Sequence, residues 1–139
     1  MRPGYELFDH TADMGVRAYA PSLPELIRAA SDGLYGVIGE LVPEGEGRGE
    51  SFAFTGGDTA ELLRDYLAEL LLIFELDHRM VTDVQVEVFE PGRLAASGES
   101  RAVSREKSAF DREVKAVTYH GLEIRAVEGG YETRFVVDV

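Results

Sequence analysis

The chain has 139 residues and no cysteine, which excludes disulfides, thiol nucleophiles and thiolate metal sites. Its formal net charge of −12 at pH 7 disfavours direct nucleic-acid binding, which needs clustered lysine and arginine, and favours cations or a basic protein partner. This length predicts one domain over residues 1–139, and no apolar run reaches the roughly 18 residues that a membrane span requires. We therefore expect a cytoplasmic protein without a membrane segment.

Two carboxylates and an imidazole lie close together near the amino terminus. Strands are expected at residues 5–8 and 16–19, and Asp9, His10 and Asp13 lie in the connection between them, just before Gly15. A glycine there suits a turn or a close backbone approach. One interpretation is a polar turn in which aspartate and threonine side chains bond local backbone groups. The other is a site for a hard cation, which prefers carboxylate, carbonyl and water oxygens.

Two helices are predicted, each with a side-chain acceptor at its start. Ser22 and Glu25 form a capping box before the first helix, and Asp58 caps the second. Apolar residues then recur at helical spacing, which predicts one buried face on each helix. The first set is Leu23, Leu26, Ile27, Ala30, Leu34, Val37, Ile38 and Leu41, and the second is Leu62, Leu63, Tyr66, Leu67, Leu70, Leu71 and Phe74.

The segment between these helices is rich in glycine and glutamate. Residues 43–49 therefore predict a mobile loop, followed by a strand at 51–54. A phosphate-binding loop needs a strand before it and a helix directly after it. Here a helix precedes the segment and a strand follows, so nucleotide binding is rejected.

From Met80 onward, apolar and polar residues alternate, which is typical of strands with one buried face. Further strands are expected at 94–98, 113–119, 122–127 and 131–137. Glycine-containing turns at 90–92 and 128–130 suit antiparallel connections. We predict an α+β fold: a single two-layer domain with two amphipathic helices packed on a mainly antiparallel sheet.

The end of the chain offers a second carboxylate. Asp138 falls on the more polar face of the last predicted strand, directly before Val139. A frayed, solvated tail is one interpretation, and a contribution to a cation site is the other. Upstream, five of the 14 basic residues reverse the local charge sign within residues 101–115, which would suit an anion or an acidic partner surface. They are Arg101, Arg105, Lys107, Arg112 and Lys115.

No motif by itself indicates catalysis. The serines lack the context of a nucleophile elbow. His10, His78 and His120 could supply a general base, and Asp13 with Glu99 could form a carboxylate pair, but their spacing does not force proximity. His78 follows the second helix and is expected in an exposed turn.

Four segments together resemble the archease family. They are the His10-Thr11-Ala12-Asp13 string with Gly15, Gly98-Glu99, the run from Val114 to His120, and the end Val136-Val137-Asp138-Val139. The resemblance implies that Asp13 and Asp138 meet at one divalent cation, with an oxygen of Val139 beside them. Two carboxylates with main-chain oxygen and water suit Ca²⁺, Mg²⁺ or Mn²⁺. His10 could be structural, could orient Asp13 or could bind the ion, and Glu99, Lys115 and His120 are candidates for supporting or partner contacts.

The resemblance also implies a function. Archease-family proteins activate the RtcB-type tRNA-splicing RNA ligase, so this chain is expected to promote guanylylation and multiple turnover of that ligase without touching the RNA. One alternative is a metal-dependent phosphoester hydrolase with His10 or His120 as base. The other is a chaperone-like interaction module. The oligomeric state stays open.

Overall fold

Two helices and ten strands make up the computed structural model, which describes residues 1–10 and 13–139 apart from the His10 side chain. The elements are β1 (Gly4–His10), β2 (Asp13–Ala20), α1 (Leu23–Ile38), β3 (Gly39–Glu40), β4 (Pro43–Thr55), α2 (Thr59–Asp77), β5 (Arg79–Glu90), β6 (Arg93–Val103), β7 (Ala109–Phe110), β8 (Ala116–Val117), β9 (Glu123–Val127) and β10 (Gly130–Asp138).

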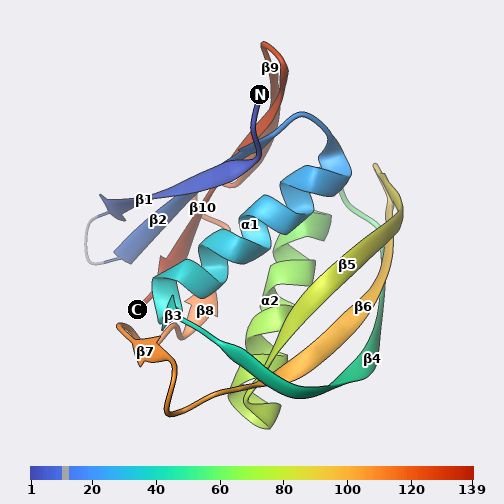
Figure 1. Ribbon diagram of the computed structural model, residues 1–139. Coiled ribbons are helices and arrows are strands. Elements are labelled where there is room, and N and C mark those ends of the chain that lie inside the picture. The colour runs from blue at the N-terminus through green and yellow to red at the C-terminus, as the bar shows by residue number, and fades with distance from the viewer. Residues whose placement is uncertain (11–12) are drawn as a thin grey trace.

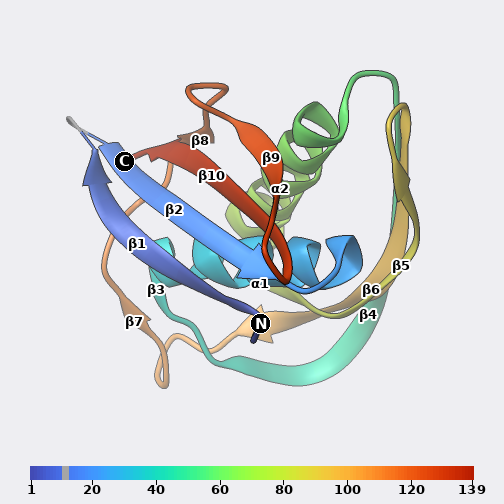
Figure 2. The same ribbon diagram turned by 90° about the horizontal axis from the view of Figure 1, so that it is seen from above.

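The helices lie between two antiparallel sheets (Figures 1 and 2). One sheet has the order β1-β2-β10-β8, with β9 also paired to β10, and the other has the order β4-β6-β5. The short strands β3 and β7 form a separate two-stranded sheet. The α+β class is therefore confirmed, but the helices are covered on both sides rather than packed on one sheet. The physical reason lies in α2, because its buried residues surround much of its circumference. A helix of this kind must be covered from more than one direction.

The predicted helix starts are confirmed in detail. The Glu25 N–H donates to Ser22 Oγ over 3.3 Å, and the Ser22 hydroxyl donates to the Glu25 carboxylate over 2.9 Å. The Glu61 N–H donates to Asp58 Oδ1 over 2.9 Å. The two bonds from the Glu25 and Glu61 N–H groups satisfy donors that have no partner inside their helices.

The two central strands of the larger sheet show which face is buried. Val16 and Ala18 on β2, and Phe135 and Val137 on β10, are fully buried in the core that the helices share. Because side chains alternate along a strand, the residues between them project to the other face, away from both helices. None of the helices in the described part of the chain is long and apolar enough to cross a membrane.

Two predictions about local structure were wrong. Residues 43–49 belong to strand β4, whose pairing with β6 has an irregularity between Glu44 and Arg48. Arginine contacts hold this segment: Arg79 and Arg101 donate to the carbonyls of Glu46 and Gly45, over 3.2 and 2.6 Å. The strand expected at 113–119 shrinks to Ala116–Val117, because only two residues there are in register with β10.

Candidate metal centre

Asp13 and Asp138 are direct cross-strand neighbours. Asp13 is the first residue of β2, Asp138 is the last residue of β10, and the register of the two antiparallel strands pairs them. Residues paired in this way share a face of the sheet and have Cβ atoms roughly 4.5–5.5 Å apart. Met14 and Val137 are buried in the core, and side chains alternate along a strand, so both carboxylates project from the face away from the helices. This spacing allows both groups to reach one ion.

The end of the chain is anchored. Asp138 is also in register with Ala116 on β8, and its carbonyl accepts a hydrogen bond of 2.7 Å from the Lys115 N–H. Val139 is half-buried at the margin of the core. A frayed, solvated tail therefore does not describe this end, and the Val139 main-chain oxygens follow directly on a backbone that strand pairing holds in place.

The other candidate residues lie on different elements of the fold. The backbone of His10 is in register with Asp13, but its side chain, like Thr11 and Ala12, lies outside the described residues, so its role stays a prediction. Lys115 is exposed and adjoins Asp138 through its backbone. Glu99 is on β6 in the other sheet, beyond the helices (Figure 1). His120 is exposed in the turn after β8.

The donor set fits a hard cation. Two adjacent carboxylates are typical ligands of Ca²⁺, Mg²⁺ and Mn²⁺. Among the side chains that the structure describes, no group of three or more histidine, aspartate or glutamate residues is arranged to hold a metal. Main-chain oxygens and water are the remaining ligands that the sequence predicts, with His10 still open as a further one.

Gly15 is required by the close approach of a ring rather than by a turn. A Cβ on Gly15 would come within 2.2 Å of the Phe8 ring. Gly15 lies on the same face of β2 as Asp13, so Phe8 covers the strand beside the carboxylate pair. The sequence left a turn and a close approach open, and the second is correct.

The face of the larger sheet that carries Asp13 and Asp138 also carries an ion-pair cluster that the sequence did not predict. Glu132 on β10 is buried, and its carboxylate accepts bonds from Arg17, Arg125 and Arg134 over 3.1–3.2 Å. Burial raises the pKa of Glu132, but the three guanidinium bonds outweigh it and hold the pKa below its usual range. The cluster joins β2, β9 and β10, and only the strand register could have predicted it.

Replacing Glu132 with glutamine should destabilise the protein by about 1–3 kcal/mol at pH 7, as expected for losing charged hydrogen bonds at a buried position. The pKa of Glu132 is lower in the folded protein than in the unfolded chain, where it is about 4.3. The extra stability of the wild type over the variant is therefore fully present above the unfolded pKa and is lost as the pH falls through the folded pKa. Urea unfolding at pH 7 and at low pH measures this. The control Glu6→Gln, an exposed partner of Arg17, should change stability little. Equal losses in both variants would contradict the role of the cluster.

Comparison with known proteins identifies the family. A sequence model of the Archease protein family matches residues 5–139. The chain belongs to the archease family. It is 34% identical to the protein archease of Methanosarcina mazei, with 97% of this chain and 95% of the relative covered. It is 32% identical to the protein archease of Pyrococcus abyssi, with 97% and 98% covered.

Two solved structures share the archease fold. The solution structure of protein 1598 from Methanobacterium thermoautotrophicum has a TM-score of 0.76 at 29% identity, with 98% of this chain and 99% of that chain covered. The crystal structure of an archease from Thermotoga maritima, described as a possible chaperone, has a TM-score of 0.67 at 21% identity, with 100% and 98% covered. The second likeness concerns the fold alone.

Proposed function

We propose that this chain is a non-catalytic, metal-binding cofactor protein that activates an RtcB-type tRNA-splicing RNA ligase. The observation that carries the proposal is the register of Asp13 with Asp138 at an anchored chain end. The ligase is part of the proposal because the resemblance stated above implies that role. The carboxylate pair would hold a divalent cation at the tip of the larger sheet, and this tip would face the ligase.

The cation should stabilise the folded protein. Two carboxylates placed directly opposite each other repel, and a bound cation offsets this repulsion and stabilises by mass action. Millimolar Ca²⁺, Mg²⁺ or Mn²⁺ should therefore raise the thermal midpoint of the wild type, measured by circular dichroism. Asp138→Asn should respond much less. A rise of equal size in both proteins would remove the support for this site.

The test of the function is RNA joining with limiting ligase, GTP and Mn²⁺. Adding this protein should raise the number of joined products per ligase molecule above one. The hydrolase alternative makes a different prediction, because a hydrolase would turn over generic phosphoesters without ligase and would lose that turnover in Asp13→Ala. Stimulation that requires the ligase supports the cofactor role, whereas turnover by the protein alone contradicts it.

A further inference from the structure

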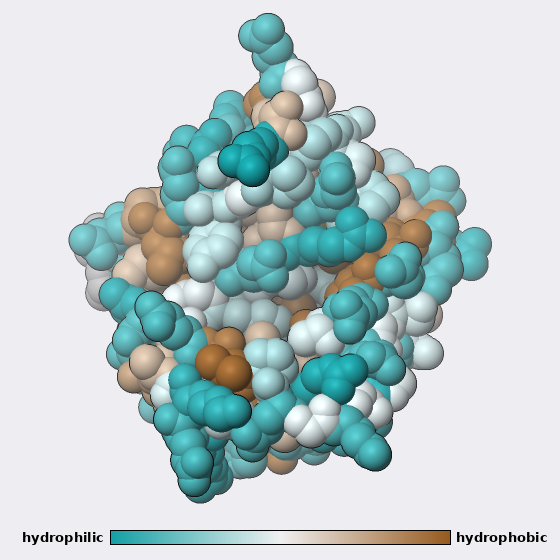
Figure 3. Space-filling model, in the orientation of Figure 1, coloured by the Kyte–Doolittle hydropathy of each residue, from teal (hydrophilic) through white to brown (hydrophobic). Residues whose placement is uncertain are grey.

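A groove follows the solvent-facing side of α1, between the edge strands β1 and β5. It consists of three adjoining recesses of about 280, 330 and 360 Å³, and Asp32 borders all three. The first recess reaches Pro3, before β1, the second follows residues 81–85 of β5, and the third reaches Tyr5 and the end of α1. Figure 3 shows this side of the molecule, with a recess near its centre bordered by hydrophilic side chains.

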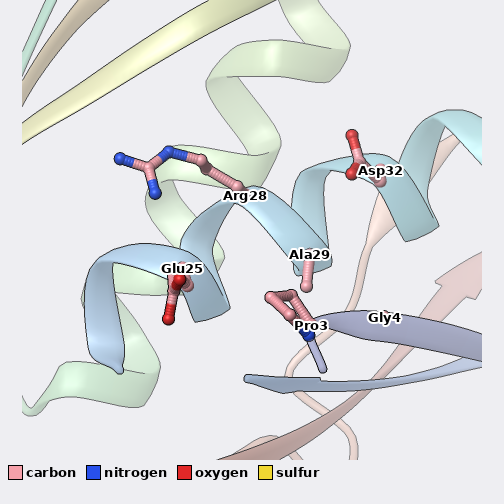
Figure 4. A pocket seen from close by; sticks show the side chains of 6 residues that line it. All are labelled: Pro3, Gly4, Glu25, Arg28, Ala29 and Asp32. Atoms are coloured by element: carbon pink, nitrogen blue, oxygen red, sulfur yellow. The ribbon is translucent and has the colours of Figure 1, made fainter. Parts of the chain in front are cut away.

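The charge in the groove is negative. Glu25, Asp32, Glu40 and Asp83 border it, and Arg28 is the one basic residue among the lining residues described. Within the described part of the chain, none of these four carboxylates forms an ion pair. Arg28 offsets these charges only in part, because it supplies one positive charge against four carboxylates. Its Nε donates to the Val84 carbonyl over 3.1 Å, and its side chain is directed away from Asp32 (Figure 4).

Asp32 is a partly desolvated carboxylate at the centre of the groove. Its side chain reaches solvent, yet the walls of the recess exclude enough water to raise its pKa by desolvation. Asp83, across the second recess, has a left-handed backbone with φ of 51°, at the point where β5 slips out of register with β6. Such irregularities re-aim a side chain. Both carboxylates border the same recess.

The groove favours recognition through side chains rather than addition of a strand. On β5, the Val81 N–H already donates to the Tyr35 hydroxyl over 2.8 Å, and the Val84 carbonyl already accepts from Arg28. The Val81 N–H is therefore not available to a ligand backbone, and Arg28 occupies one of the two lone pairs of the Val84 carbonyl. Tyr5 borders the third recess and is 38% exposed, so its ring is available to a cation.

We propose that this groove binds an extended, basic segment of a protein partner, with lysine or arginine side chains lying against Asp32 and Asp83. From Glu25 to the end of α1 at Ile38 the groove is roughly 20 Å long, at about 1.5 Å per helical residue, and Glu40 lies just beyond. This length accommodates about six or seven residues of extended chain. The negative groove selects the basic partner by charge complementarity. The surface is separate from Asp13 and Asp138, which project from the far face of the larger sheet, so it does not rest on the proposed ligase role.

The experiment is an NMR titration of the ¹⁵N-labelled protein at low salt. The probe is a blocked seven-residue peptide that alternates lysine with serine, and a glutamate–serine peptide of the same length is the comparison. The lysine peptide should shift amide signals in residues 25–40 and 81–85. Asp32→Asn should weaken its binding about fivefold, the upper range for one exposed charge pair. Removing a desolvated charge should leave the thermal midpoint no lower than that of the wild type, which separates lost binding from unfolding.

The matched control is Glu75→Gln, which removes one exposed carboxylate on α2, beside a different recess formed with β8. It should leave peptide binding within experimental error of the wild type. Equal weakening by Asp32→Asn and Glu75→Gln would mean that only the overall charge attracts the peptide, and would overturn the proposal. Equal binding of the acidic peptide would overturn it too. Shifts in the groove that appear without peptide as the protein is concentrated would assign the groove to a second copy of this chain instead.

Discussion

Replacing Leu67 with alanine should lower the free energy of unfolding by about 2–5 kcal/mol, through lost transfer energy and the cavity left behind. Leu67 is fully buried in α2, the helix that both sheets cover, so the surroundings have little freedom to collapse into the space. Urea unfolding followed by circular dichroism measures the loss as a lower midpoint with an unchanged slope.

Leu72→Ala is the matched control on the same helix. Leu72 is 44% exposed, so the same chemical change should cost well under half as much. Similar losses in the two variants would mean that α2 is not buried as described. The metal-dependent rise in the thermal midpoint should persist in Leu67→Ala, because the carboxylate pair lies on the other face of the larger sheet.

Local chemistry accounts for the parts of the fold that the sequence predicted well. The capping bonds of Ser22 and Asp58 involve residues only three positions apart, so the sequence contains both partners side by side. The helical spacing of apolar residues likewise identified buried positions such as Leu67 and Leu70.

Contacts between distant segments account for the errors. Residues 43–49 have the composition of a loop, yet Arg48 bonds Asp77 over 2.7 Å and arginines from β5 and β6 hold the neighbouring carbonyls. The second sheet could not be predicted either, because alternation along a strand shows that one face is buried but not which element covers it.

The candidate site likewise has parts that the sequence predicted and parts that only the fold determines. Composition favoured a polar turn at Asp13 and a frayed tail at Asp138, and only the resemblance to a family brought these two residues together. The register of β2 with β10 gives that pairing a physical basis. The Glu132 cluster had no sequence signal, because its arginines come from three strands whose alignment only the fold determines.

Replacing Asp13 with alanine should abolish multiple-turnover RNA joining while leaving the fold intact. The change removes one of two carboxylates that the proposed cation needs, and it also removes the repulsion between Asp13 and Asp138. The apo domain should therefore keep its circular dichroism spectrum, with stability equal to or slightly above that of the wild type. The assay uses limiting ligase, GTP and Mn²⁺, and counts joined products per ligase with each variant added in turn.

The matched control is Glu123→Gln, which removes an exposed carboxylate from β9 in the same sheet and should stimulate joining like the wild type. Lys115→Ala tests the neighbouring positive charge, and it should weaken stimulation if the ligase contacts this tip. Full stimulation by Asp13→Ala would mean that Asp13 only shapes the connection between β1 and β2. The carboxylate pair predicts that Asp13→Ala keeps its fold but loses both the stimulation of joining and the rise of the thermal midpoint with metal. One missing ligand then accounts for both losses.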